Sequence, residues 1–121
     1  MKRFLALLAL VLLIEPAHAA EIERKRDDFM GCIATLSGPI VKGDADKLEA
    51  MLPDLRLDVA AALTELYGYT WDAPASVQFD GFRLCLNSPG GSLSEAIRMG
   101  DILHAYAIGT AVARDADCQS A

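Results

Sequence analysis

The segment Asn87–Gly91, with the sequence Asn-Ser-Pro-Gly-Gly, has the residue types needed to bind a negatively charged oxygen. It follows the apolar run Leu84–Leu86 and precedes Ser92 and Glu95, whose spacing is typical of a capping box at a helix start. We therefore expect a strand, a tight turn and a helix. The first turn of a helix has unpaired N–H groups, and glycines let an oxygen approach closely. The segment is a candidate anion or oxyanion site, although Pro-Gly-Gly can also serve only to turn the chain.

The elements around this turn predict a parallel strand pair. In Phe82–Asn87 the side chains alternate in character, which is typical of a strand with one face formed by Phe82, Leu84 and Leu86 and the other by Arg83, Cys85 and Asn87. Ser92–Ala107 has helical periodicity, and Thr110–Ala113 predicts a further strand after Gly109. Strand, helix and strand in succession predict an α/β fold. The helix is expected to bury the stripe Leu93, Ala96, Ile97, Gly100, Leu103 and Ala107.

The first half of the chain has weaker signals. The charged run Glu21–Asp28 is interpreted as a solvated lead-in, and Phe29–Leu36 as the first strand. Asp44 is the expected N-cap of a short helix that Pro53 ends. Apolar residues at helical spacing then predict a second helix over Leu55–Gly68.

The amino terminus has the organisation of a Sec-type signal peptide. Met1–Arg3 is positively charged, Phe4–Ile14 is an apolar run, and Ala17–Ala19 has small residues where a signal peptidase would cut. We expect residues 1–19 to be removed by cleavage after Ala19, so that the protein is periplasmic or secreted. The alternative is an uncleaved anchor, but the apolar run is short for a bilayer.

The remaining residues 20–121 are long enough for one domain. Without Lys2, Arg3 and Glu15, the 11 basic and 17 acidic residues fall to 9 and 16, a net charge of −7. An acidic chain with no basic patch is not expected to bind nucleic acid.

His104 is the one histidine left, and the cysteine spacings fit no common zinc pattern, so neither a metal nor a cofactor is predicted. The three cysteines, Cys32, Cys85 and Cys118, cannot all pair within one molecule.

Three segments together resemble the proteolytic subunit of Clp protease and its relatives in the Clp/crotonase superfamily, closest to a secreted bacterial branch. Asn87–Gly91 is similar to the oxyanion-hole motif, Leu36–Ala45 to the first strand and turn, and Cys118–Ala121 to the segment with the nucleophilic serine. The resemblance covers most of Phe29–Ala121. It implies an α/β fold of repeated β-β-α spiral units with parallel strands. This chain would be its N-terminal part, ending just after the nucleophile, with a helical and aromatic insertion at about 55–78.

The same resemblance assigns roles to individual residues. Ser120 would be the nucleophile, and the backbone N–H groups of Gly91, Gly90 and Ala121 would form the oxyanion hole. The family's histidine base and its orienting acid lie further downstream, whereas His104 falls on a scaffold helix. Secreted relatives also imply that Cys118 pairs with a residue beyond Ala121.

The function expected from these observations is that of an exported, ATP-independent serine hydrolase or peptidase, represented by its N-terminal part. The chain alone is expected to be inactive because the general base is missing. Its partners would be a peptide or acyl substrate, and the resemblance allows a homo-oligomer. The first alternative is a non-catalytic periplasmic protein that binds a peptide or carboxylate through Gly90 and Gly91. An acyl-CoA-binding crotonase, which the signal peptide disfavours, and a sequence shortened by a frameshift or gene boundary are further alternatives.

Overall fold

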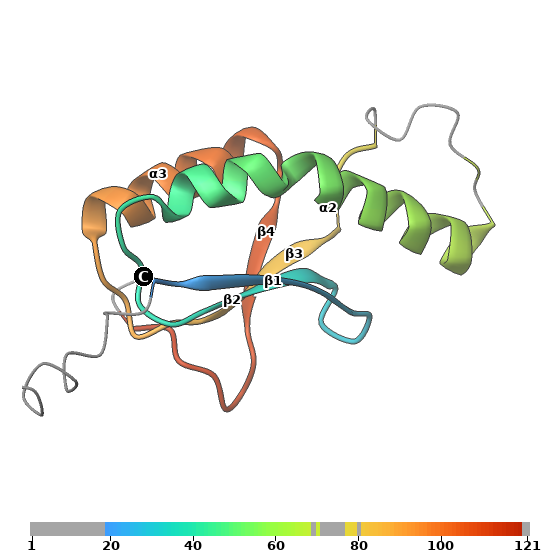
Figure 1. Ribbon diagram of the computed structural model, residues 1–121. Helices are drawn as coiled ribbons and strands as arrows, with labels where there is room; N and C mark the ends of the chain where they lie inside the picture. The colour runs from blue at the N-terminus through green and yellow to red at the C-terminus, as the bar shows by residue number, and fades with distance from the viewer. Residues whose placement is uncertain (1–18, 69, 71–76, 80, 120–121) are drawn as a thin grey trace, which may run out of the picture.

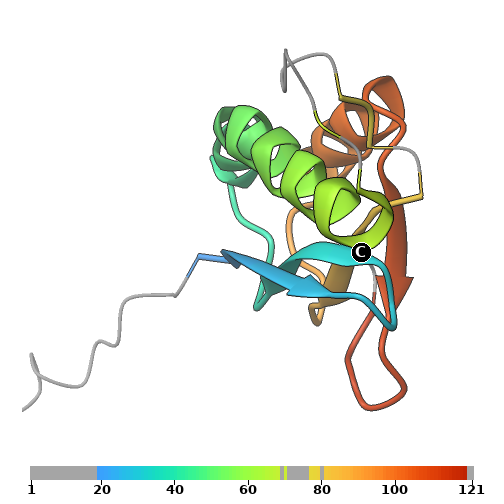
Figure 2. The same cartoon turned by 90° about the vertical axis from the view of Figure 1, so that its right-hand side faces the viewer.

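The computed structural model describes residues 19–68, 70, 77–79 and 81–119. They form a four-stranded sheet with two helices covering one of its faces (Figures 1 and 2). The strands are β1 (Glu21–Asp27), β2 (Cys32–Ser37), β3 (Arg83–Asn87) and β4 (Gly109–Val112), and the helices are α2 (Asp44–Tyr67) and α3 (Leu93–Ala105). The predicted α/β class is confirmed as a small two-layer fold with a mixed sheet.

The strands follow one another across the sheet in the order β1-β2-β3-β4. β1 is antiparallel to β2, whereas β2, β3 and β4 are mutually parallel. The predicted parallel pair is confirmed, with Leu84 opposite Thr110 and Leu86 opposite Val112. The carboxyl ends of the three parallel strands therefore lie at the same end of the sheet, and the Asn87–Gly91 turn begins there.

The interpretation of Glu21–Asp28 as a solvated lead-in is wrong, because this charged segment forms the edge strand β1. Antiparallel pairing with β2 satisfies its backbone, and an edge strand can keep charged side chains in solvent. Two arginines also connect it to α2. Arg24 pairs with Asp58, and Arg26 donates to Glu65 at 2.7 Å. The strand predicted at Phe29–Leu36 begins three residues later, after a turn at which Phe29 is exposed.

The two helices predicted on either side of Pro53 form one continuous helix, α2. A proline inside a helix removes one backbone hydrogen bond, which usually favours a break. Pro53 lies on the exposed face of α2, while an apolar stripe on the opposite face packs on the core. Burial of this stripe offsets the lost bond. The expected end of the helix is confirmed, since Gly68 caps it in a left-handed conformation with φ 71.

The core lies between the sheet and the two helices. Its large, fully buried apolar side chains come from β2, α2, β3 and the segment before β3: Leu36, Leu48, Leu55, Val59, Val77, Phe79 and Leu84. The predicted common face of Phe82, Leu84 and Leu86 is confirmed, because all three belong to or pack against this core.

The buried face of α3 differs from the predicted stripe. Leu93 and Ile97 are 70% and 56% exposed, whereas Glu95, Met99 and Leu103 are buried. Because α3 packs against α2 as well as against the sheet, its buried face is rotated toward α2 and includes a carboxylate.

Most of the predicted signal peptide and of the aromatic part of the predicted insertion, Tyr69–Pro74, lies outside the described residues. Within the described ranges, no helix combines the length and the apolar character needed to cross a membrane.

Candidate oxyanion site

The turn after β3 is held against the loop that follows β2. The Ile40 N–H donates to the Gly90 carbonyl at 2.9 Å, and the Ser92 N–H donates to the Ile40 carbonyl at 2.8 Å. These two bonds form a short parallel bridge between Ile40 and Gly91. The backbone of the turn is therefore fixed on both sides of Gly91.

The two glycines of the turn differ in what their N–H groups do. The buried Gly90 donates to Ser88 Oγ at 3.1 Å. The exposed Gly91 donates to no other described residue. A Cβ at Gly91, where φ is 147, would overlap the Ile40 carbonyl, so the close packing requires glycine. Among the described residues, the turn thus presents one fixed and unoccupied donor, the Gly91 N–H.

The predicted helix start at Ser92 is confirmed, but the second half of the capping box is absent. Ser92 Oγ accepts from the Glu95 N–H at 3.3 Å, as an N-cap does. The Glu95 side chain crosses to α2 instead, where Oε1 accepts from the N–H groups of Gly43 at 3.0 Å and Ala45 at 2.9 Å. A buried carboxylate on α3 therefore caps the first turn of α2.

The prediction of Asp44 as the N-cap of α2 is wrong. Gly43 occupies the cap position and Asp44 is the first helical residue, fully buried. Its carboxylate accepts from the Val41 N–H at 2.8 Å and pairs with Lys47 at 3.0 Å. The local sequence does not reveal which side chain caps α2, because the capping carboxylate belongs to Glu95, about fifty residues away.

We expect Glu95→Ala to lower the free energy of unfolding by about 2 kcal/mol, because two N–H groups at the start of α2 would lose their acceptor. Chemical denaturation measures this change. Glu49→Ala, at an exposed position of α2, is the matched control and should change stability by less than about 0.5 kcal/mol. Equal losses in the two variants would contradict the capping role of Glu95.

The last described residues, 117–119, are hydrogen-bonded to the same turn. The Asp117 N–H donates to Asn87 Oδ1 at 3.0 Å, the Ser88 N–H donates to the Asp117 carbonyl at 2.8 Å, and the Gln119 N–H donates to the Ser88 carbonyl at 3.2 Å. A parallel bridge between Ser88 and Cys118 results. The predicted nucleophile Ser120 and the predicted donor Ala121 lie outside the described residues.

We expect Asn87→Ala to speed amide hydrogen exchange at Asp117 about tenfold, because the side-chain acceptor of this N–H is lost. Exchange followed by NMR measures the effect residue by residue. Asn87→Asp keeps an oxygen at the accepting position and should preserve most of the protection. Unchanged exchange in both variants would show that Asn87 does not hold this segment.

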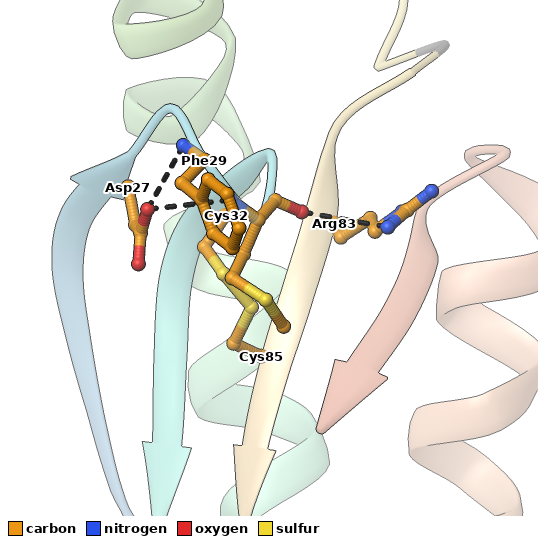
Figure 3. Close-up of a disulfide and its surroundings, with 6 residues drawn as sticks. Asp27, Phe29, Cys32, Arg83 and Cys85 are labelled. Atoms are coloured by element: carbon orange, nitrogen blue, oxygen red, sulfur yellow. Dashed lines mark hydrogen bonds between the residues drawn. A yellow bond between two sulfur atoms is a disulfide. The ribbon is translucent and has the colours of Figure 1, made fainter. Parts of the chain in front are cut away.

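The other side chains considered as catalytic or metal-binding groups are His104 and the three cysteines. His104 is exposed in the last turn of α3, about 18 Å along the helix from Ser92. Cys118 is exposed and has a free thiol. Cys32 and Cys85 form a disulfide between β2 and β3, with a Cα–Cα distance of 5.7 Å (Figure 3). No group of three or more metal-ligating side chains occurs among the residues that the structure describes.

A groove on the sheet face opposite the helices passes the start of the turn. It has a volume of about 280 Å³. Its walls come from β1, β2, β3 and the segment after β4, and include Lys25, Asp27, Thr35, Cys85, Asn87 and Asp115. The groove is mixed in polarity and carries charges of both signs. It offers space for an extended polar segment beside Asn87.

Three residues that shape this site are not among the predicted site residues: Ile40, Ser88 and Glu95. A serine two positions before a glycine N–H is a local signal for the Ser88 contact. The spacing of Ser92 and Glu95 indicates the helix start but not the contact of Glu95 with α2. Ile40 is far from the turn in sequence, and its pairing has no local signal.

The Clp/crotonase resemblance depends on the motifs described above and on their order along the chain. Comparisons with models of protein families, with curated proteins and with solved structures give no match to this chain.

Proposed function

We propose that the chain carries the nucleophile and the oxyanion-binding turn of an exported, ATP-independent serine hydrolase or peptidase of the Clp/crotonase type. The observation that carries this proposal is the turn itself. It holds the Gly91 N–H without an acceptor among the described residues, and Gln119, the residue before Ser120 in sequence, is hydrogen-bonded to Ser88 in the same turn. Nucleophile and oxyanion donor must be neighbours in such a site.

In the proposed reaction, the Ser120 oxygen attacks a carbonyl carbon. The new O–C bond forms while the carbonyl electron pair moves onto its oxygen, and the Gly91 N–H donates to the oxyanion. The serine proton must pass to a base. His104 is too distant from the turn to accept it, and residues 20–121 contain no second histidine. Residues 20–121 alone are therefore expected to bind a substrate carbonyl oxygen at the Gly91 N–H but not to cleave the acyl bond.

The proposed location and substrate class rest on two further observations. The Cys32–Cys85 disulfide supports an oxidising compartment, in line with export. Outside the cytoplasm an ATP-driven unfolding motor has no fuel, so the enzyme would act without one. The groove beside Asn87 has both acidic and basic residues, which suits a peptide or a similar polar acyl compound better than an apolar chain.

A second function is favoured by the same unoccupied donor and by the distance of His104. Without a base, a fixed N–H on a turn before a helix start is suited to bind a carboxylate or a peptide C-terminus. In this case Ser120 has no covalent role, and the protein is an exported peptide- or carboxylate-binding protein.

A fluorophosphonate probe separates the two functions. The exported protein, taken from the cell that naturally produces it, is treated with the probe and analysed by mass spectrometry. Labelling at Ser120 that is lost in Ser120→Ala supports the hydrolase. An unlabelled protein that binds a peptide carboxylate supports the binding function, and a protein that does neither contradicts both.

A further inference from the structure

The direction of the Gly91 N–H depends on the loop between β2 and α2. The Ile40 N–H donates to the Gly90 carbonyl before Gly91, and the Ile40 carbonyl accepts from the Ser92 N–H after it. The Gly91 backbone also packs so closely on Ile40 that a side chain would overlap it. The Gly91 N–H can therefore keep one direction only as long as Ile40 keeps its position.

The far end of this loop is held by Glu95 of α3. Both helices begin at the same end of the sheet (Figure 1). Glu95 Oε1 accepts from the N–H groups of Gly43 at 3.0 Å and Ala45 at 2.9 Å. Glu95 is 4% exposed, so little water competes for these bonds. The Glu95 N–H donates to Ser92 Oγ at 3.3 Å, so Glu95 is bound both to the loop and to the residue that follows the turn.

These contacts close a small ring. Its two sides are the loop segment 40–43 and the segment 92–95 at the start of α3, each four residues long. Their first residues are joined by a backbone hydrogen bond of 2.8 Å, and their last residues by the bond of 3.0 Å from Gly43 to Glu95. Because the sides are short, the second bond supports the geometry of the first.

The charge of Glu95 is compensated on its other oxygen. Arg98 Nη1 lies 3.3 Å from Glu95 Oε2, and Arg98 Nη2 lies 2.8 Å from Asp46 in the first turn of α2. Arg98 therefore bridges α3 and the start of α2. A carboxylate near an anion-binding turn opposes anion binding by its charge. Any favourable effect of Glu95 on the turn must therefore come from the position that it imposes.

We propose that Glu95 is a positioning residue for the oxyanion-binding turn. It fixes the loop at Gly43, and through the ring it fixes Ile40 and the Gly91 N–H. The inference rests on the proposed function of this turn, in its hydrolytic or its binding form. It gives the buried carboxylate a role in ligand affinity in addition to its role in the stability of α2. Without an acceptor at the place of Oε1, the loop end is released, and the Gly91 N–H no longer points steadily at a bound oxygen.

Two substitutions of Glu95 separate position from charge. Glu95→Asp keeps the charge but is too short to reach the loop, whereas Glu95→Gln removes the charge and keeps an oxygen at the accepting position. The exported protein is titrated, by NMR, with a short N-acetylated peptide that has a free C-terminal carboxylate. Glu95→Asp should shift the Ile40 and Ser92 amide resonances before peptide is added, and should weaken binding at Gly91 about tenfold. Glu95→Gln should bind within about twofold of the wild type.

Val59→Ala is the control for a loss of stability alone. Val59 is fully buried in the second half of α2 and takes no part in the ring. Its substitution should lower the unfolding temperature but leave the resonances and the affinity unchanged. Thermal unfolding of all three variants checks that they remain folded.

The outcomes distinguish this role from the proposed function. A wild-type Gly91 resonance that does not respond to the peptide contradicts the proposed function. The positioning role is then decided by the Ile40 and Ser92 resonances, which should still move in Glu95→Asp. The positioning role is overturned if Glu95→Asp leaves these resonances in place. It is also overturned if Glu95→Gln or Val59→Ala weakens binding as much as Glu95→Asp does.

Discussion

Replacing Gly91 by alanine is expected to lower the free energy of unfolding by about 4 kcal/mol, a large part of the stability of a domain of this size. The added Cβ would overlap the Ile40 carbonyl and lie 2.8 Å from the Ile40 nitrogen. The backbone there, with φ 147, is also one that residues with a side chain rarely adopt. Either the turn moves away from Ile40, or the hydrogen bonds of Ile40 with Gly90 and Ser92 break.

Gly43→Ala separates steric overlap from backbone strain. Gly43 also has a positive φ, 100, but a Cβ there would meet no atom within 4 Å. Its substitution should cost only about 1 kcal/mol. Denaturant unfolding of both variants measures the difference. If the two substitutions cost the same, the contact of Gly91 with Ile40 does not determine the conformation of the turn.

Loss of the Cys32–Cys85 disulfide is expected to have a comparably large effect, about 4 kcal/mol. The bond closes a chain segment with a sequence separation of 53, and a loop of this length restricts the unfolded chain strongly. It joins the neighbouring strands β2 and β3 (Figure 3). Cys85 lies two residues before Asn87, where the turn begins. Reduction should therefore lower both the stability of the fold and the order of the turn. Unfolding by urea with and without a reductant measures the loss.

Cys118 provides the control for this experiment. Its thiol is exposed and free, so Cys118→Ser should change the stability by less than about 0.5 kcal/mol. The double variant Cys32→Ala and Cys85→Ala should make the protein insensitive to the reductant. A protein whose stability depends on Cys118 and not on the other two cysteines would have a different pairing.

The elements near the candidate site could be predicted from sequence because their signals are local. Alternation in β3, the Ser92 cap and the periodicity of α3 each depend on residues a few positions apart. The errors occur where distant contacts decide the structure. β1 is a strand because β2 pairs with it and because its arginines meet α2, and nothing in the charged run itself indicates this.

The same distinction applies to α2 and to the site. Pro53 is a valid local signal for a helix end, but α2 continues through it because its apolar stripe packs on the core.

In the candidate oxyanion site, the motif predicts two glycine donors. The structure separates them, because Ser88 Oγ occupies the Gly90 N–H and Ile40 fixes the position of Gly91. These contacts involve side-chain rotamers and a distant loop, which a sequence motif does not specify.

The measurement that most directly tests the role of the turn is the chemical shift of the Gly91 amide during a titration. The protein is titrated with a short N-acetylated peptide that has a free C-terminal carboxylate, and with the same peptide as its C-terminal amide. We expect the Gly91 N–H resonance to move downfield and to saturate with the carboxylate, and to respond much more weakly to the amide. The Gly90 resonance should move less, because the Gly90 N–H already donates a hydrogen bond to Ser88 Oγ. A Gly91 resonance that does not move, or that responds equally to both peptides, would contradict the assignment of this turn as an oxyanion or carboxylate site.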